Sequence, residues 1–189
     1  KIVIYMTLTK TPICNFGEKA KNFNLLATEN EKLTLNNIKG ENGTLIMFIC
    51  NHCPYVKAII KDLVSDVKFL EDLGIKSAGI MSNDVKNYPD DSFENMISFS
   101  KLHGFSFPYL IDETQNVAKE YGAVCTPDFF GYNNNLELQY RGRIRELKDL
   151  KPVRKNDSDL KIAMKMVAET GKGPQNQIPS MGCNIKWFK

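Results

Sequence analysis

The segment Phe48-Ile-Cys-Asn-His-Cys-Pro-Tyr-Val-Lys57 decides the fold, because it joins two stretches with different apolar spacing. Residues 44–50 form a continuous apolar run, which is typical of a central strand covered on both faces. Residues 54–73 carry apolar side chains at helical spacing, and Gly74 follows where a helix commonly ends. Cys53 therefore lies at a predicted strand-to-helix junction, directly before Pro54, a residue that the first turn of a helix tolerates.

This position gives the thiol of Cys53 an unusual environment. A helix N-terminus presents the positive end of the helix dipole and unpaired backbone N–H groups, and both stabilise a thiolate. We therefore expect the pKa of Cys53 to lie below the value of about 8.5 for a free cysteine. His52 beside it and Lys57 one turn later add donors or positive charge. The alternative is a buried, unreactive cysteine, since free cysteines are often buried; we predict a reactive nucleophile.

The rest of the chain alternates between strand-like and helix-like segments. Strands are expected over 23–26, 32–35, 44–50, 75–81 and 107–111, helices over 54–73, 92–102, 113–121 and 157–170, and a hairpin over 128–140. Ser92 is placed to cap the second of these helices. This order predicts an α/β domain with a mixed central sheet flanked by helices.

Composition excludes several classes of function. The 189 residues carry a net charge of +3, with the basic residues dispersed, so we expect no nucleic-acid partner. No apolar run approaches the roughly 20 residues that span a bilayer, so we expect no membrane partner. The apolar patch within 1–6 is too short for a signal-peptide core, and we expect a cytoplasmic location. The sequence leaves open whether a targeting segment was removed.

Four segments together carry a resemblance to a known family. They are Gly17-Glu-Lys-Ala-Lys-Asn-Phe23, Asn51-His-Cys-Pro-Tyr-Val56, Val124-Cys-Thr-Pro-Asp-Phe-Phe130 and Pro179-Ser-Met-Gly-Cys-Asn-Ile-Lys-Trp187. The chain resembles the thioredoxin-like superfamily, and within it a peroxiredoxin-like branch of the AhpC/TSA group that carries the Asn-His-Cys-Pro-Tyr-Val motif. The resemblance implies a thioredoxin-like domain, which we place over 16–170. The residues before it, 1–15, are interpreted as an N-terminal arm, and 171–189 as a C-terminal tail that is loop-like apart from its end at 185–188.

The resemblance also implies a function. It points to a thiol-dependent oxidoreductase, antioxidant or disulfide-exchanging, that uses Cys53 as nucleophile and needs no cofactor. Its substrate would contain a disulfide or a peroxide, and its reductant would be thioredoxin or a small thiol. The Thr126-Pro127 bond is expected to be cis and to face Cys53, so that His52, Pro54, Thr126 and Pro127 bind substrate. Cys125 is then a candidate resolving thiol; a packed small side chain is the alternative.

The chain also departs from the patterns of its relatives. Val56 occupies the second position of the thioredoxin Cys-x-x-Cys pair. With Cys53 taken as the peroxidatic residue, Cys50 and Ile46 occupy the Thr and Pro positions of the standard peroxiredoxin motif, which is therefore absent. Cys50 is interpreted as a core residue at the end of its strand. Cys183 either folds back onto the site or lies near the surface.

A second class of function stays open from the sequence. Cys50, His52 and Cys53 could ligate a soft metal such as Cu(I) or Zn, as in a thioredoxin-fold module for copper binding or delivery. Two other groups have structural interpretations. Residues 88–93 are a turn and helix cap or the lining of a substrate cleft, and the arginines of 141–145 are interpreted as a solvated strand edge.

Overall fold

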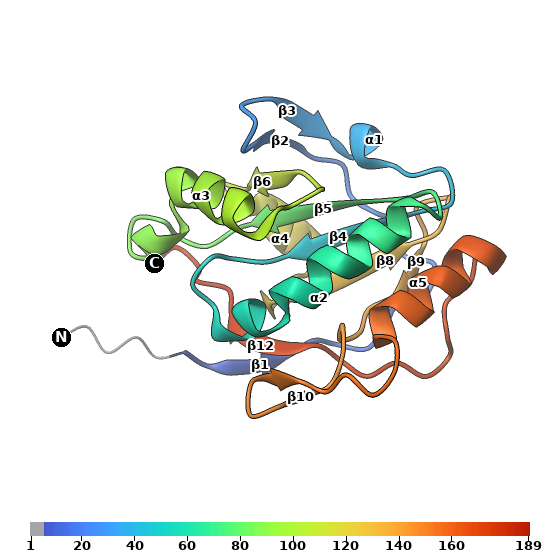
Figure 1. The fold of residues 1–189 in the computed structure, drawn as a ribbon. Helices are drawn as coiled ribbons and strands as arrows, with labels where there is room; N and C mark the ends of the chain where they lie inside the picture. Colours follow the sequence, from blue (N-terminus) through green and yellow to red (C-terminus); the bar gives the residue numbers. More distant parts are fainter. Residues whose placement is uncertain (1–5) are drawn as a thin grey trace.

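The structure, a computed structural model, describes residues 6–189 (Figure 1). Its main sheet has seven strands, and their order across the sheet is β3-β2-β6-β5-β4-β8-β9. The neighbours β4, β5 and β6 run parallel and the other pairs are antiparallel, so the predicted mixed sheet is confirmed. The strands in chain order are β2 (Asn24–Ala27), β3 (Lys32–Thr34), β4 (Gly43–Phe48), β5 (Ile75–Met81), β6 (Tyr109–Ile111), β8 (Asp128–Tyr132) and β9 (Leu138–Tyr140).

Strand β4 lies inside the sheet and explains the continuous apolar run. Its side chains alternate between two cores, with Leu45 and Met47 in one and Ile46 and Phe48 in the other. The first core is covered by α2 (Pro54–Glu71), α3 (Phe93–His103) and α5 (Asp159–Thr170), and the second by α1 (Leu35–Ile38) and α4 (Asn116–Tyr121) (Figure 1). Both faces of β4 are therefore buried from solvent.

Helix α2 begins at the predicted residue and α3 one residue after its predicted cap, whereas α4 and α5 begin three and two residues later than predicted. The hydroxyl of Ser92 accepts a hydrogen bond from the backbone N–H of Asn95 and caps α3, as predicted. Ser158 caps α5 in the same way. Among the described residues, no helix combines the length and the apolar character needed to cross a membrane.

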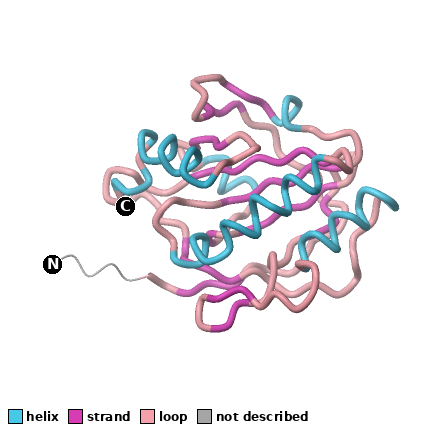
Figure 2. The backbone as a smooth tube through the Cα atoms, viewed as in Figure 1, coloured by secondary structure: helices cyan, strands magenta, loops and turns pink. Residues whose placement is uncertain are grey.

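A second, three-stranded sheet lies against the N-terminal end of α2 (Figure 2). Its order is β1 (Leu8–Lys10), β12 (Met181–Asn184), β7 (Cys125–Thr126), and both pairs are antiparallel. The prediction of a loop-like tail is therefore wrong for residues 181–184, and the predicted arm contributes a strand as well. The division at 15/16 and 170/171 stays a prediction.

The remaining elements are short. They are the 3-10 helix η1 (Pro89–Asp91) before α3, and a small hairpin of β10 (Leu147–Lys148) and β11 (Lys151–Pro152). The hairpin predicted over 128–140 is confirmed by β8 and β9.

Candidate active site

Cys53 is the N-cap residue of α2, with extended backbone angles (φ −68°, ψ 123°), and Pro54 opens the helix. The chain leaves β4 at Phe48, crosses a short connection and enters the helix, so the predicted junction is confirmed. The side chain of Cys53 is 0% exposed. Its sulfur lies where the helix presents unpaired N–H groups, and the backbone N–H of Val56 hydrogen-bonds to it.

A second thiol from the far end of the chain meets Cys53. The Sγ atoms of Cys53 and Cys183 lie 2.9 Å apart, and Cys183 is 3% exposed. Cys183 is on β12, directly opposite Thr126 in the pairing of β12 with β7. Gly182 permits this close pairing, because a Cβ at that position would lie 2.0 Å from the carbonyl oxygen of Thr126. The tail therefore delivers a thiol to the helix start by strand pairing.

The loop after β7 completes this wall of the site. The Thr126–Pro127 peptide bond is cis, as the family resemblance implied. The carbonyl oxygen of Thr126 lies 3.2 Å from the Sγ of Cys53 and accepts a hydrogen bond when that thiol is protonated. Pro127 also borders a cavity of about 470 Å³, whose lining includes Tyr55, Ser180 and Met181. The helix start, the cis-proline loop and β12 therefore enclose Cys53 together.

The two facing thiols have opposite acidities. The pKa of Cys53 is lowered by the hydrogen bond from Cys183, by a second one from Cys50 and by the N–H of Val56, against the opposing effect of burial. The pKa of Cys183 is raised by its hydrogen bond to Cys53 and by burial. The Thr126 carbonyl opposes ionisation of Cys53, but the three donors outweigh it. Cys53 is thus the thiolate of the pair and Cys183 the thiol.

Cys50 and Cys125 occupy different surroundings. Cys50 is buried in the core, as predicted, with its Sγ 3.4 Å from the hydroxyl of Thr126, and burial raises its pKa. Cys125 is also buried, and its thiol donates to the carbonyl oxygen of Pro127 at 3.6 Å, within its own loop. Burial raises its pKa above the usual range. The sequence made Cys125 a candidate resolving thiol and left open whether Cys183 folds back onto the site or lies near the surface; the structure places Cys183 against Cys53.

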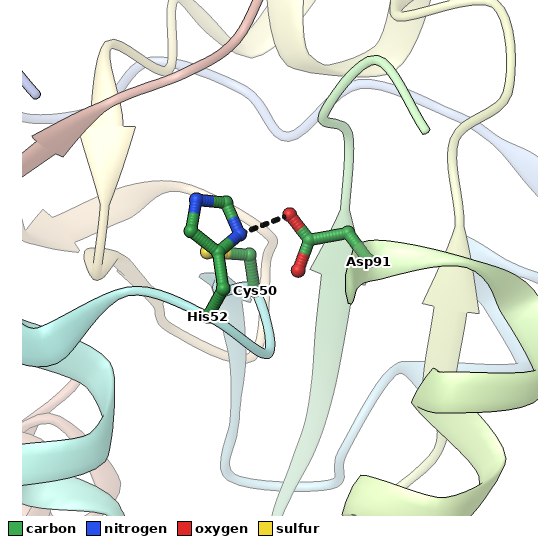
Figure 3. A group of neighbouring side chains, drawn as sticks. All are labelled: Cys50, His52 and Asp91. Atoms are coloured by element: carbon green, nitrogen blue, oxygen red, sulfur yellow. Dashed lines mark hydrogen bonds and ion pairs between the residues drawn. The ribbon is translucent and has the colours of Figure 1, made fainter. Parts of the chain in front are cut away.

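His52, Asp91 and Cys50 form a neighbouring group, in which one donor atom from each lies within 4.8 Å of the others (Figure 3). The Nδ1 of His52 lies 2.6 Å from Oδ2 of Asp91. Asp91 is fully buried, and its two oxygens also accept hydrogen bonds from the backbone N–H of Asn51 and the amide of Asn83, both at 2.8 Å. Sequence reasoning did not single out Asp91, which lies in the segment 88–93 that was interpreted as a turn and helix cap or as the lining of a substrate cleft.

This group has the composition of a metal site but not the geometry of one. Two ligands of a tetrahedral zinc ion lie about 3.3 Å apart, since each bond is about 2.0–2.1 Å. The separation of 2.6 Å between His52 and Asp91 is a hydrogen bond instead. Cys53, the third ligand of the copper interpretation, is engaged with Cys183. The copper-binding interpretation has no support here.

The predicted solvated edge at residues 141–145 is wrong for Arg141. Its side chain is buried, and its Nη2 lies 3.0 Å from Oδ2 of Asp128, which follows the cis proline. The guanidinium also donates to the carbonyl of Gly122 and stacks on Phe130. The pair anchors the Pro127 loop to β9.

Comparison with known proteins agrees with this arrangement. Residues 16–147, well over half of the chain, match the AhpC/TSA family. The chain belongs to the AhpC/TSA family. No protein of curated function matches it.

Two solved structures are similar to this chain over nearly their whole length. An uncharacterized conserved protein from Geobacillus kaustophilus has 36% identity and a TM-score of 0.92, covering 98% of each chain. A hypothetical protein from Sinorhizobium meliloti 1021 has 34% identity and a TM-score of 0.88, covering 96% of this chain and 99% of that one. Peroxidoxin BcpB from Mycobacterium tuberculosis, with 14% identity, a TM-score of 0.54 and coverage of 65% and 81%, shares the thioredoxin-like fold.

Proposed function

We propose that this AhpC/TSA protein is a thiol oxidoreductase in which Cys53 is the nucleophile and Cys183 the resolving thiol. The observation that carries the proposal is the separation of 2.9 Å between the two sulfur atoms at the start of α2. A thiolate is the attacking species in thiol chemistry, and the lowered pKa of Cys53 supplies one near neutral pH. A thiol already in contact needs little movement to complete a disulfide, whose S–S bond is about 2.05 Å long.

With a disulfide substrate, the reaction has two steps. The Cys53 thiolate attacks one substrate sulfur, which forms a mixed disulfide and releases the other sulfur as a thiolate. Cys183 then loses its proton and attacks the Cys53 sulfur, which releases the second substrate thiolate and leaves a Cys53–Cys183 disulfide. The substrate gains two electrons and the cysteine pair loses two. Thioredoxin or a small thiol restores the pair by the same exchange.

With a hydroperoxide, the same residues give a related sequence. The Cys53 thiolate attacks the terminal peroxide oxygen, an alkoxide or hydroxide leaves and is protonated, and Cys53 becomes a sulfenic acid. Cys183 attacks this sulfur, and water leaves as the disulfide forms. Because both thiols are almost fully buried, a peroxide reaches them with less displacement of β12 than a protein disulfide requires.

The substrate-binding roles of His52, Pro54, Thr126 and Pro127 are part of this proposal. Pro54 directly follows Cys53 in the chain, the carbonyl oxygen of Thr126 lies 3.2 Å from the Cys53 sulfur, and Pro127 borders a cavity that Tyr55 of the same helix also lines. An entering substrate atom would therefore lie between the helix start and the cis-proline loop. A cytoplasmic location, where reducing thiols are abundant, is also proposed.

Peptide mapping of the reduced protein tests the proposal. After one equivalent of hydrogen peroxide or of bis(hydroxyethyl) disulfide, we expect a Cys53–Cys183 crosslink. Cys53→Ser should form none, and Cys183→Ser should stop at a sulfenic acid or mixed disulfide on Cys53. Cys14→Ser, away from the site, is the control and should crosslink normally.

The other outcomes are equally clear. A Cys53–Cys125 crosslink would assign the resolving role to Cys125, as the sequence suggested, and remove it from Cys183. An unmodified Cys53 with both reagents would refute the oxidoreductase proposal.

A further inference from the structure

One nitrogen of the His52 imidazole, Nε2, has no role in the contact between Cys53 and Cys183 described above. Its Nδ1 is hydrogen-bonded to Asp91, and its Nε2 lies on the opposite side of the ring, pointing away from that carboxylate (Figure 3). Among residues 6–189, no group hydrogen-bonds to this Nε2, although it is buried from solvent. A buried polar atom without a partner is uncommon and calls for a role.

Asp91 determines which nitrogen of His52 carries the fixed proton. The carboxylate accepts hydrogen bonds from Asn51, Asn83 and His52. Because an ionised carboxylate can only accept, each of these partner atoms must carry a hydrogen, Nδ1 of His52 included. The proton on Nδ1 is therefore held in place, and exchange with a neighbour is left to Nε2. A base oriented by a buried carboxylate is the arrangement that serves proton transfer to and from nucleophiles and leaving groups.

The surroundings of the pair hold the ring in position. The ring of Tyr88 stacks nearly parallel to the imidazole, with 11° between the planes and 5.8 Å between the centroids. The Nζ of Lys186, a residue that follows β12, lies over the ring of Tyr88, 5.8 Å from the ring centroid. Its backbone N–H donates to Asn83, the residue that also donates to Asp91. The segment that carries Cys183 is thereby tied to the His52–Asp91 pair.

We propose that His52, positioned by Asp91, is the acid–base residue of this thiol site and exchanges a proton through Nε2 with the group that Cys53 displaces from its substrate. The inference rests on the proposed oxidoreductase function. His52 directly precedes Cys53 on the connection between β4 and α2. Cys50, whose sulfur lies within 4.8 Å of a ring nitrogen of His52, also hydrogen-bonds to Cys53, so the imidazole and the thiolate share this neighbour. Imidazole is the side chain suited to proton exchange near neutral pH.

The proton balance of the proposed cycle is complete. When Cys53 attacks a disulfide, the protonated Nε2 gives its proton to the departing thiolate, which leaves as a thiol. The neutral Nε2 then accepts the proton of Cys183 through the site, and the Cys183 thiolate closes the disulfide. With a disulfide substrate, His52 therefore loses one proton and gains one. With a peroxide, the first proton goes to the leaving alkoxide or hydroxide, and the proton taken from Cys183 goes to the hydroxide that leaves the sulfenic acid as water. Reduction of the disulfide by two thiols then returns one proton to His52 and one to Cys183, and His52 takes part in no electron transfer.

Two disulfide reagents separate proton donation from a structural role. The leaving group of bis(hydroxyethyl) disulfide is an alkyl thiolate, which is a strong base and gains from a proton donor. The leaving group of dithiobis(nitrobenzoate) is an aryl thiolate of low pKa, which leaves readily without a proton. The measured quantity is the rate that depends on Cys53, taken as the difference from a Cys53→Ser variant at neutral pH.

His52→Asn is the informative variant, because the asparagine amide keeps a donor toward Asp91 while Nε2 is removed. We expect its rate with the alkyl disulfide to fall by about 100-fold or more and its rate with the aryl disulfide to change by less than about threefold. His103→Asn, at the end of α3, is the matched control and should leave both rates unchanged. Melting temperatures confirm that each variant is folded, and His52→Gln replaces His52→Asn if the latter is not.

Each other outcome overturns the inference in its own way. Equal loss with both reagents means that His52 is structural, and unchanged rates with both mean that it has no part in the reaction. If the wild-type protein itself shows no Cys53-dependent rate with either reagent, the oxidoreductase proposal fails before His52 is tested.

Discussion

Oxidation of the Cys53–Cys183 pair to a disulfide is expected to raise the free energy of unfolding, by an amount that depends on the number of residues between the two cysteines. The two cysteines are 130 residues apart in sequence. A crosslink closing a loop of that length removes chain entropy from the unfolded state worth about 5 kcal/mol at 25 °C. The sulfurs must also move from 2.9 Å to about 2.05 Å, and this approach strains the native state.

The net effect is smaller than this entropy. The hydrogen bonds that lower the pKa of Cys53 stabilise the reduced native state, and oxidation removes them. We therefore expect the oxidised protein to be more stable by about 2–4 kcal/mol. With a denaturant slope of about 4 kcal/mol/M, the midpoint of guanidinium unfolding should rise by roughly 0.5–1 M.

The assay is guanidinium unfolding of the oxidised and the reduced protein, with the crosslink verified by peptide mapping. Cys125→Ala is the matched control and should keep the full difference, whereas Cys183→Ser should show none. An oxidised protein that is no more stable than the reduced one would refute the reasoning. It would mean that native-state strain cancels the entropy, and that the contact between the two sulfurs does not represent a pair ready to bond.

Three further perturbations test the elements around the site. Arg141→Met leaves Asp128 buried without its cation and should cost about 3–5 kcal/mol by urea unfolding at neutral pH, with a smaller loss under mildly acidic conditions that protonate the carboxylate. Gly182→Ala places a Cβ against the Thr126 carbonyl, so it should lower the melting temperature and abolish the crosslink. Cys53→Ser should remove the thiolate ultraviolet absorbance of the reduced protein near neutral pH. The pKa of Cys53 is lower in the folded protein than in the unfolded chain, so the stability that this thiol adds is fully present above about pH 8.5 and declines as the pH falls. Unfolding of the wild-type protein and of Cys53→Ser at several pH values below 8.5 measures this decline.

The junction at Cys53 could be predicted because its signals are local. Three signals lie within a few residues of the cysteine: a fully apolar strand before it, a proline directly after it, and apolar residues at helical spacing beyond the proline. Each of these follows from backbone geometry. The cap at Ser92 and the β8–β9 hairpin were predictable for the same reason. The cis bond before Pro127 came from the family resemblance, since most X-Pro bonds are trans.

The sequence raised the possibility that Cys183 folds back onto the site, but no local signal could decide it. Strand β12 has four residues, including Gly182 and Cys183, and is too short to display the alternation of a strand. Its position depends on pairing with β7 and β1, which are far away in the sequence. Asp91 was missed on similar grounds, because burial of an acidic residue depends on donors contributed by other segments.

The balance between Cys53 and Cys183 determines the direction in which the pair works. By a thermodynamic cycle, a disulfide that stabilises the fold by 2–4 kcal/mol is itself stabilised by the fold to the same extent, which lowers its reduction potential by roughly 40–90 mV. That net value already includes the donors that stabilise the Cys53 thiolate, which act in the opposite sense because they favour the reduced form. If the chain entropy stabilises the disulfide more than the hydrogen-bond donors stabilise the Cys53 thiolate, the reduced protein gives its electrons readily to a disulfide or peroxide. The measured difference in stability therefore decides whether this site acts as a reductant or as an oxidant of its partners.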